Sequence, residues 1–169
     1  ALVETLDAVR DIYENNPKAG IACALKNSGL GVGIPDTGRC KITVKDGLVH
    51  VTSSAACIGQ GMGTVQIQMI CETAGIMPDR IVYDTPDTLF SPDSGNTTAS
   101  RQTLFTGEAA VRAAKALKAA LDEKGSLAAL EGCEFTGEYT GVTDKMGSDK
   151  KNPVSHIAYG YATHVVELN

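Results

Sequence analysis

Hydrophobic residues at the start of the chain recur at helical spacing, with charged residues between them. Those that would share one helix face are Leu2, Leu6, Val9 and Tyr13. This spacing predicts an amphipathic helix over residues 2–14 that ends before Pro17. A short β-like segment over residues 20–26 and a glycine-rich loop over residues 28–38 follow it.

The pattern then changes to the strict alternation of a β-hairpin. Residues 40–45 and 48–53 both alternate, and the Asp46-Gly47 pair between them is a preferred two-residue hairpin turn. The two segments are therefore predicted to form half-buried antiparallel strands, with Ile42 on the apolar face.

Two further helices are predicted downstream of the hairpin. The first covers residues 64–74, is apolar on two faces and ends at Gly75, a typical left-handed cap. The second is rich in alanine, covers roughly residues 101–123 and has Ser100 as its N-cap. Its apolar stripe consists of Leu104, Val111, Ala114, Leu117 and Leu121. Gly107 in this helix would allow a neighbouring element to approach closely.

Shorter segments complete the pattern. Strands are predicted over residues 80–83, near residues 135–139 and over residues 156–168, and residues 84–99 form a polar connection. The strands are grouped around two helices without strict β-α-β alternation. We therefore predict a single α+β domain over residues 1–169, a two-layer sandwich of a mostly antiparallel sheet with two main helices.

Composition places the chain among soluble globular proteins. Apolar residues make up 43% and charged residues 21% of the 169 positions, which argues against disorder. No stretch of about 18 apolar residues could span a membrane, and no basic leader precedes an apolar stretch. The net charge of −5, without a Lys/Arg cluster and without Trp, disfavours a nucleic-acid partner. Because the chain begins inside a predicted helix and ends at the tip of a predicted strand, we expect it to be part of a longer subunit.

Cysteines and histidines give no sign of metal or nucleophilic chemistry. The five cysteines are widely spaced and form no C-x-x-C motif. They predict buried, reduced thiols with structural roles, as in a reducing cytoplasm. His50 lies on the polar side of a predicted strand, facing solvent or paired. No catalytic residue and no metal ligand is predicted in this chain.

One constellation points to a ligand. The glycine-rich run over residues 59–64 (GQGMGT) lies between a strand and a helix start, where free backbone N–H groups and the helix dipole hold anions. The run over residues 97–100 (TTAS) repeats this arrangement at the second helix. Arg101 beside it is unfavourable for the helix dipole, which is explained if an anion lies nearby. Ordinary helix capping also accounts for both turns.

The two turns together resemble the molybdenum hydroxylases, the family of xanthine dehydrogenase and aldehyde oxidase, in their large molybdopterin-binding subunit. The pairing of G-Q-G with T-A-S carries the resemblance, since each motif alone is weak. Residues 20–38 (GIACALKNSGLGVGIPDTG) and 152–168 (NPVSHIAYGYATHVVEL) also resemble that family. Within it, the chain looks most like bacterial xanthine dehydrogenases.

The resemblance implies half of a cofactor site. The residues it assigns to cofactor binding are Gly59, Gln60, Gly61 and Thr64 on one turn, Thr98, Ala99 and Ser100 on the other, and Thr88 as a weaker match. The amide of Gln60 both donates and accepts, which suits a pterin edge. The motifs of the substrate pocket have no match here, and the catalytic glutamate of the family would lie beyond Asn169.

The resemblance also implies a function for the longer subunit. The whole enzyme would hydroxylate a heterocycle such as a purine, or an aldehyde, with oxygen derived from water. It would carry a molybdenum-molybdopterin cofactor, with or without an added nucleotide, and its partners would be the rest of the molybdenum subunit and iron–sulfur and FAD domains or subunits. This chain alone would be inactive and without cofactor. The alternative is a non-catalytic ligand-binding or interaction module on the same scaffold.

Overall fold

A computed structural model describes residues 1–168, which form two separate β-sheets. The strands are β1 (Ala19–Ser28), β2 (Asp36–Lys45), β3 (Leu48–Thr52), β4 (Ile81–Tyr83), β5 (Glu134–Gly141) and β6 (Ala158–Glu167). The helices are α1 (Leu2–Asp7), α2 (Arg10–Glu14), α3 (Met62–Ala74) and α4 (Gln102–Lys124), with short 3₁₀ turns η1 (Pro78–Arg80) and η2 (Ala128–Leu130).

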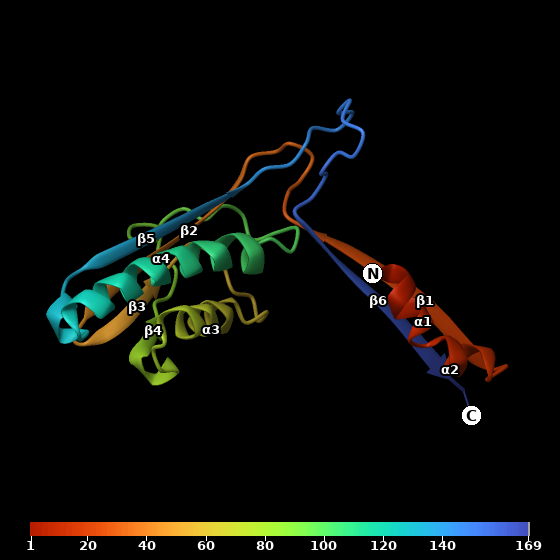
Figure 1. The fold of residues 1–169 in the computed structure, drawn as a ribbon, viewed down its shortest axis with the longest axis horizontal. Coiled ribbons are helices and arrows are strands. Elements are labelled where there is room, and N and C mark those ends of the chain that lie inside the picture. The colour runs from red at the N-terminus through yellow and green to blue at the C-terminus, as the bar shows by residue number, and fades with distance from the viewer. Residues whose placement is uncertain (169) are drawn as a thin grey trace.

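The larger sheet and the two long helices form a sandwich. Its strand order is β4-β3-β2-β5, and α3 and α4 pack on one face (Figure 1). Only the β3–β4 pair is parallel among the described strands, so the predicted α+β sandwich with a mostly antiparallel sheet is confirmed. β1 and β6 form a two-stranded arm that reaches away from the sandwich, with α1 and α2 beside it (Figure 1).

The β2–β3 hairpin confirms the strongest local prediction. Its turn residues Asp46 and Gly47 both have positive φ angles, 53° and 69°, as the mirror-image turns of hairpins require. β2 begins earlier than predicted because its first residues pair with β5, starting with Asp36 opposite Gly141. The strand predicted near residues 135–139 is thus an edge of the sheet.

The core lies between this sheet and the two helices. Its fully buried members are Ile42, Val44, Val49 and Val51 of the hairpin, Ile70 of α3, and Ala109, Ala110, Ala113, Ala114 and Leu117 of α4. The rest of the predicted α4 stripe, Leu104, Val111 and Leu121, is only half-buried. α4 therefore meets the sheet mainly through alanines, which allow a close approach. No helix in the described part of the chain is long and apolar enough to cross a membrane.

Glycines bring α4 close to both of its neighbours. On the α3 side, a Cβ at Gly107 would lie 2.5 Å from Sδ of Met69, which confirms the predicted close approach. On the sheet side, a Cβ at Gly137 of β5 would overlap the carbonyl oxygen of Ala109. Backbone thus lies against backbone where α4 crosses β5.

We expect Gly137→Val to lower the free energy of unfolding by about 2–3 kcal/mol, in the upper range for overpacked cores, because the overlap is with rigid backbone. Urea unfolding measures this change. Gly20→Val is a matched control, since a Cβ at this exposed strand position meets nothing within 4 Å in the described structure. Equal midpoints for the two variants would contradict the close helix–sheet contact.

The N-terminal segment differs from its prediction. The single helix over residues 2–14 is in fact two short helices that break at Ala8–Val9. None of their residues is buried within residues 1–168, and α1 is held to the arm by a 2.8 Å hydrogen bond between the Thr5 and Thr163 hydroxyls. Short helices are marginal without tertiary packing, and a two-stranded arm offers little apolar surface for it.

The bounds of the two arm strands also differ from the predicted ones: β1 is longer than predicted and β6 is shorter. β1 extends beyond residues 20–26 on both sides because β6 pairs with its whole length, starting with Ala19 opposite Glu167. β6 begins at Ala158, so His156 precedes the strand.

Candidate functional site

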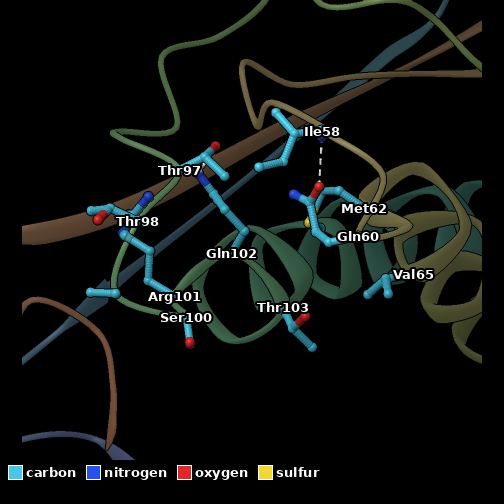
Figure 2. A pocket seen from close by; sticks show the side chains of 11 residues that line it. Ile58, Gln60, Met62, Val65, Thr97, Thr98, Ser100, Arg101, Gln102 and Thr103 are labelled. Carbon is cyan, nitrogen blue, oxygen red and sulfur yellow. Dashed lines mark hydrogen bonds between the residues drawn. The ribbon is translucent and has the colours of Figure 1, made fainter. Parts of the chain in front are cut away.

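A cleft of about 400 Å³ opens between the N-termini of α3 and α4 (Figure 2). Its lining residues are Ile58, Gln60, Met62 and Val65 on the α3 side, and Thr97, Thr98, Ala99, Ser100, Arg101, Gln102 and Thr103 on the α4 side. Because α3 and α4 pack against each other, two turns that are distant in sequence face the same cavity.

The structure brings most of the predicted cofactor residues to this region. Those that line the cleft are Gln60, Thr98, Ala99 and Ser100. Gly59 and Gly61 belong to the loop that carries Gln60, and Thr64 is exposed on the first turn of α3. Thr88 lies in a separate hollow of about 290 Å³. The two predicted turns are therefore neighbours, and Thr88 is not part of their cleft.

Both helices begin at the cleft without a cap from the side chain of the N-cap residue. α3 follows Gly61 and α4 follows Arg101, and neither N-cap side chain bonds to its helix. The N–H groups of a first helical turn have no acceptor within the helix, and the positive end of the helix dipole adds to their field. Two such helix starts at one cleft favour an anionic ligand.

The backbone of the α3-side loop is open to a ligand at two glycines. Gly59 and Gly61 have φ angles of 111° and 80°, and a Cβ at either would meet no described atom within 4 Å beyond its neighbours in the chain. Gly63 differs, because a Cβ there would lie 2.8 Å from the ring of Tyr83. The first two glycines thus expose backbone, whereas Gly63 serves packing.

The α4-side turn is strained at two consecutive residues. Ala99 and Ser100 have φ angles of 49° and 52°, a region that non-glycine residues occupy at a cost of about 1–3 kcal/mol each. The predicted N-cap role of Ser100 is wrong, since Arg101 is the N-cap of α4. A capping serine needs extended backbone, which Ser100 does not have.

The amide of Gln60 closes its own loop. Its Oε1 accepts the N–H of Ile58 at 2.7 Å, as Figure 2 shows, and its Nε2 donates to the carbonyl of Ala56 at 2.8 Å. An amide oxygen accepts a second bond and an NH₂ group donates a second. Gln60 therefore shapes the loop and keeps bonding capacity for a ligand in the cleft.

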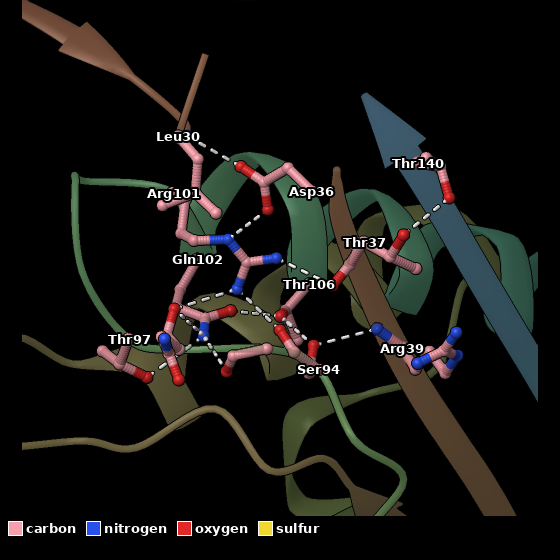
Figure 3. A network of polar contacts seen from close by, with 12 residues as sticks. Leu30, Asp36, Thr37, Arg39, Ser94, Thr97, Arg101, Gln102, Thr106 and Thr140 are labelled. Atoms are coloured by element: carbon pink, nitrogen blue, oxygen red, sulfur yellow. Dashed lines mark hydrogen bonds and ion pairs between the residues drawn. The ribbon is translucent and has the colours of Figure 1, made fainter. Parts of the chain in front are cut away.

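Arg101 lies beside the cleft, but its charge is neutralised inside the protein (Figure 3). Its Nε lies 2.5 Å from Oδ1 of Asp36, and the two side chains are only 1% and 3% exposed. The anion that offsets the unfavourable position of Arg101 is therefore a carboxylate of the same chain. Sequence reasoning missed Asp36 altogether.

Cys57 lies directly before the cleft-lining residue Ile58, and sequence reasoning missed its reactivity. The prediction of buried thiols is wrong for Cys23, Cys57 and Cys133, which are exposed. Hydrogen bonds from backbone N–H groups, foremost that of Gly59, lower the pKa of the Cys57 thiol. A cysteine just before a helix N-terminus is the sequence signal that could have revealed it. By contrast, burial raises the pKa of the Cys40 thiol to about 12.

We expect Cys57 to be alkylated by iodoacetamide at neutral pH before the other cysteines, and Cys40 to be the last. The thiolate is the reactive form, so a lowered pKa and exposure both favour Cys57. Its rate should also level off at a lower pH than that of free cysteine in the same buffer. Peptide mass spectrometry over a pH series measures both, and equal pH profiles for Cys57 and free cysteine would contradict the effect of the loop N–H groups.

Other titratable groups lie away from the cleft. His50 Nδ1 is 3.1 Å from Oδ1 of Asp84, so of the two predicted alternatives, facing solvent or paired, the structure has the paired one. Across residues 1–168, no group of three or more His, Cys, Asp or Glu side chains could hold a metal ion.

Residues 7–167 match the molybdopterin cofactor-binding domain family, and the chain belongs to this family. This confirms the resemblance to molybdenum hydroxylases. The chain is 38% identical over 101 residues to the xanthine dehydrogenase molybdenum-binding subunit of Escherichia coli O157:H7, covering 59% of this chain and 13% of that protein. It is 30% identical over 114 residues to the gamma subunit of the 6-hydroxypseudooxynicotine dehydrogenase complex of Paenarthrobacter nicotinovorans, covering 68% and 14%.

Solved structures share the fold. The aldehyde oxidoreductases of Desulfovibrio desulfuricans ATCC 27774 and Desulfovibrio gigas both align with a TM-score of 0.75 over 97% of this chain. Their sequences are 22% and 24% identical to it, and the chain covers 20% and 21% of theirs. The chain thus spans a small part of the length of all the relatives described.

Proposed function

We propose that this chain is the cofactor-holding part of a longer molybdenum hydroxylase subunit, and that residues 1–169 form one domain of its C-terminal, molybdenum-binding region. The observation that carries the proposal is the cleft between two uncapped helix starts, in a chain of the molybdopterin-binding family. A pterin phosphate is anionic and the pterin ring has a polar edge, and both suit free backbone N–H groups. The proposed contacts are Gly59, Gln60, Gly61 and Thr64 on one side, Thr98, Ala99 and Ser100 on the other, and Thr88 from the second hollow.

The residues of this chain would bind and orient the cofactor rather than react. The N–H groups at the two helix starts would hold its anionic part, and Gln60 would use its second donor and acceptor toward the ring. Ile58 and Met62 would form an apolar wall that keeps water from one side of the ligand. When bound, the molybdenum cofactor supplies the oxidation chemistry. We propose that the general-base glutamate lies outside this chain.

The activity of the whole enzyme is also a proposal. We propose a cytoplasmic hydroxylase of a heterocycle such as a purine, or of an aldehyde, with oxygen from water. Electrons would leave toward iron–sulfur clusters and FAD on other domains or subunits. The similarity to a xanthine dehydrogenase molybdenum-binding subunit supports this class of substrate.

Hydrogen exchange of the full-length subunit, made in hosts with and without pterin-cofactor synthesis, tests the proposal. Binding of the cofactor should slow backbone amide exchange in residues 57–64 and 97–104. It should leave exchange in residues 115–124 of α4 unchanged. Protection elsewhere but in neither turn would move the cofactor site away from this cleft. A full-length subunit that holds no molybdenum in the competent host would favour the non-catalytic module.

A further inference from the structure

The guanidinium of Arg101 is fully engaged inside the protein (Figure 3). Besides the ion pair with Asp36, its Nη1 donates to the carbonyls of Ser94 at 2.6 Å and Asn96 at 3.0 Å, and its Nη2 donates to the carbonyl of Thr37 at 2.8 Å. Every nitrogen of the group thus has a partner within the chain. Four of its five N–H donors are used in these bonds, so the guanidinium is bound mainly within the chain although Arg101 lines the cleft.

These bonds hold the loop that leads into the cleft-lining turn. Ser94 and Asn96 lie directly before residues 97–100, and the Gln102 side chain adds a 3.1 Å bond to the hydroxyl of Thr97. The left-handed conformation of Ala99 and Ser100 persists only where surrounding contacts impose it.

The Arg101–Asp36 ion pair also connects the turn over residues 97–100 to the base of the arm. Oδ2 of Asp36 accepts the N–H of Leu30 at 2.8 Å, and the N–H of Gly29 donates to the carbonyl of Ala99 at 3.1 Å. The turn is therefore fixed from three sides: by its own helix, by the first residues of β2, and by the segment that follows β1.

We propose that the buried Arg101–Asp36 pair is a positioning device, which holds the backbone of residues 97–100 in the conformation that receives the cofactor without touching the cofactor itself. This rests on the proposed function. It assigns cofactor retention to two residues whose charged groups bond to each other inside the protein. Lysine in place of Arg101 would keep the charge, but one ammonium group cannot replace a planar fork that reaches three carbonyls and a carboxylate.

Arg101→Lys in the full-length subunit tests this, with Leu117→Ala as the matched control. Leu117 is fully buried on the same helix and does not line the cleft, so its truncation lowers stability without altering the turn. In cofactor-free subunit, Arg101→Lys should speed exchange of the N–H groups of Gly29 and Leu30 by at least about tenfold. These groups donate to the carbonyl of Ala99 and to Oδ2 of Asp36, which Arg101 holds in place through charge-assisted hydrogen bonds. Leu117→Ala should leave those amides unchanged.

In the cofactor-competent host, Arg101→Lys should lower the molybdenum bound per subunit at least about fivefold, whereas Leu117→Ala should retain it at a temperature where both are folded. Unchanged amide exchange at the contacts of the turn, or faster amide exchange with wild-type molybdenum content, overturns the inference.

If Arg101→Lys does not fold, Asp36→Asn, which keeps the shape of the carboxylate, is measured against the same outcomes. A wild-type subunit without molybdenum would instead overturn the proposed function, and the exchange rates would still decide whether Arg101 restrains the turn.

Discussion

Asp36→Ala is expected to lower the free energy of unfolding by about 3–5 kcal/mol, the range found when one partner of a buried ion pair is removed. The guanidinium of Arg101, 1% exposed, would remain buried without its carboxylate. The N–H of Leu30 would also lose its acceptor. The midpoint of urea unfolding, at unchanged slope, measures the loss.

The exposed pair Arg39–Glu138 provides the control. Its Nε–Oε2 distance is 2.6 Å, but the side chains are 42% and 56% exposed, so Glu138→Ala should cost less than about 1 kcal/mol. A double substitution of Asp36→Leu with Arg101→Met should recover only part of the loss, because the carbonyl of Ser94 loses its donor. Similar losses for Asp36→Ala and Glu138→Ala would contradict the role of burial.

Gln60→Ala in the full-length subunit should weaken cofactor retention by about ten- to hundredfold, equivalent to about 1.5–3 kcal/mol for hydrogen bonds to a strongly polar ligand. The amide both closes the loop at Ala56 and Ile58 and faces the cleft. Its loss therefore loosens the loop and removes a contact. The amounts of molybdenum and pterin bound per subunit, measured at a series of cofactor supplies, give the change in retention.

Two other glutamine variants make this result specific. Gln68→Ala removes an exposed amide on α3 that does not line the cleft and should leave molybdenum content unchanged. Gln60→Glu keeps an acceptor for the loop but brings a negative charge toward an anionic ligand. It should therefore reduce cofactor retention more than Gln60→Ala does. Normal retention in Gln60→Ala would make Gln60 a turn residue only.

Features encoded within a few residues could be predicted from the sequence. The hairpin turn at Asp46-Gly47 and the end of α3 at Gly75 depend on local backbone preferences, and both are confirmed. The two glycine- and serine-rich turns were also recognisable, because their motifs are short and contiguous. Their meeting at one cleft depends on the packing of α3 against α4.

Features that depend on distant contacts were missed or incomplete. The Asp36–Arg101 pair joins residues 65 positions apart, and neither residue has a local signal for the other. β5 gave a weak hydrophobic pattern, since its buried positions are Gly137 and Gly141, where α4 and Phe105 lie against the strand. Small residues that permit close packing carry no apolar periodicity.

The pairing of β1 with β6 makes the sandwich an insertion within one long hairpin. The described chain passes between arm and sandwich through residues 29–35 and 142–157. Bringing Ala19 opposite Glu167 closes a loop that contains the whole sandwich, and the entropy of that closure opposes early pairing. We therefore expect β1 and β6 to pair last during folding. By then the folded sandwich holds the end of β1 and the start of β6 near each other. Because all the residues that line the cleft lie between the two arm strands, the cleft can form before these strands pair.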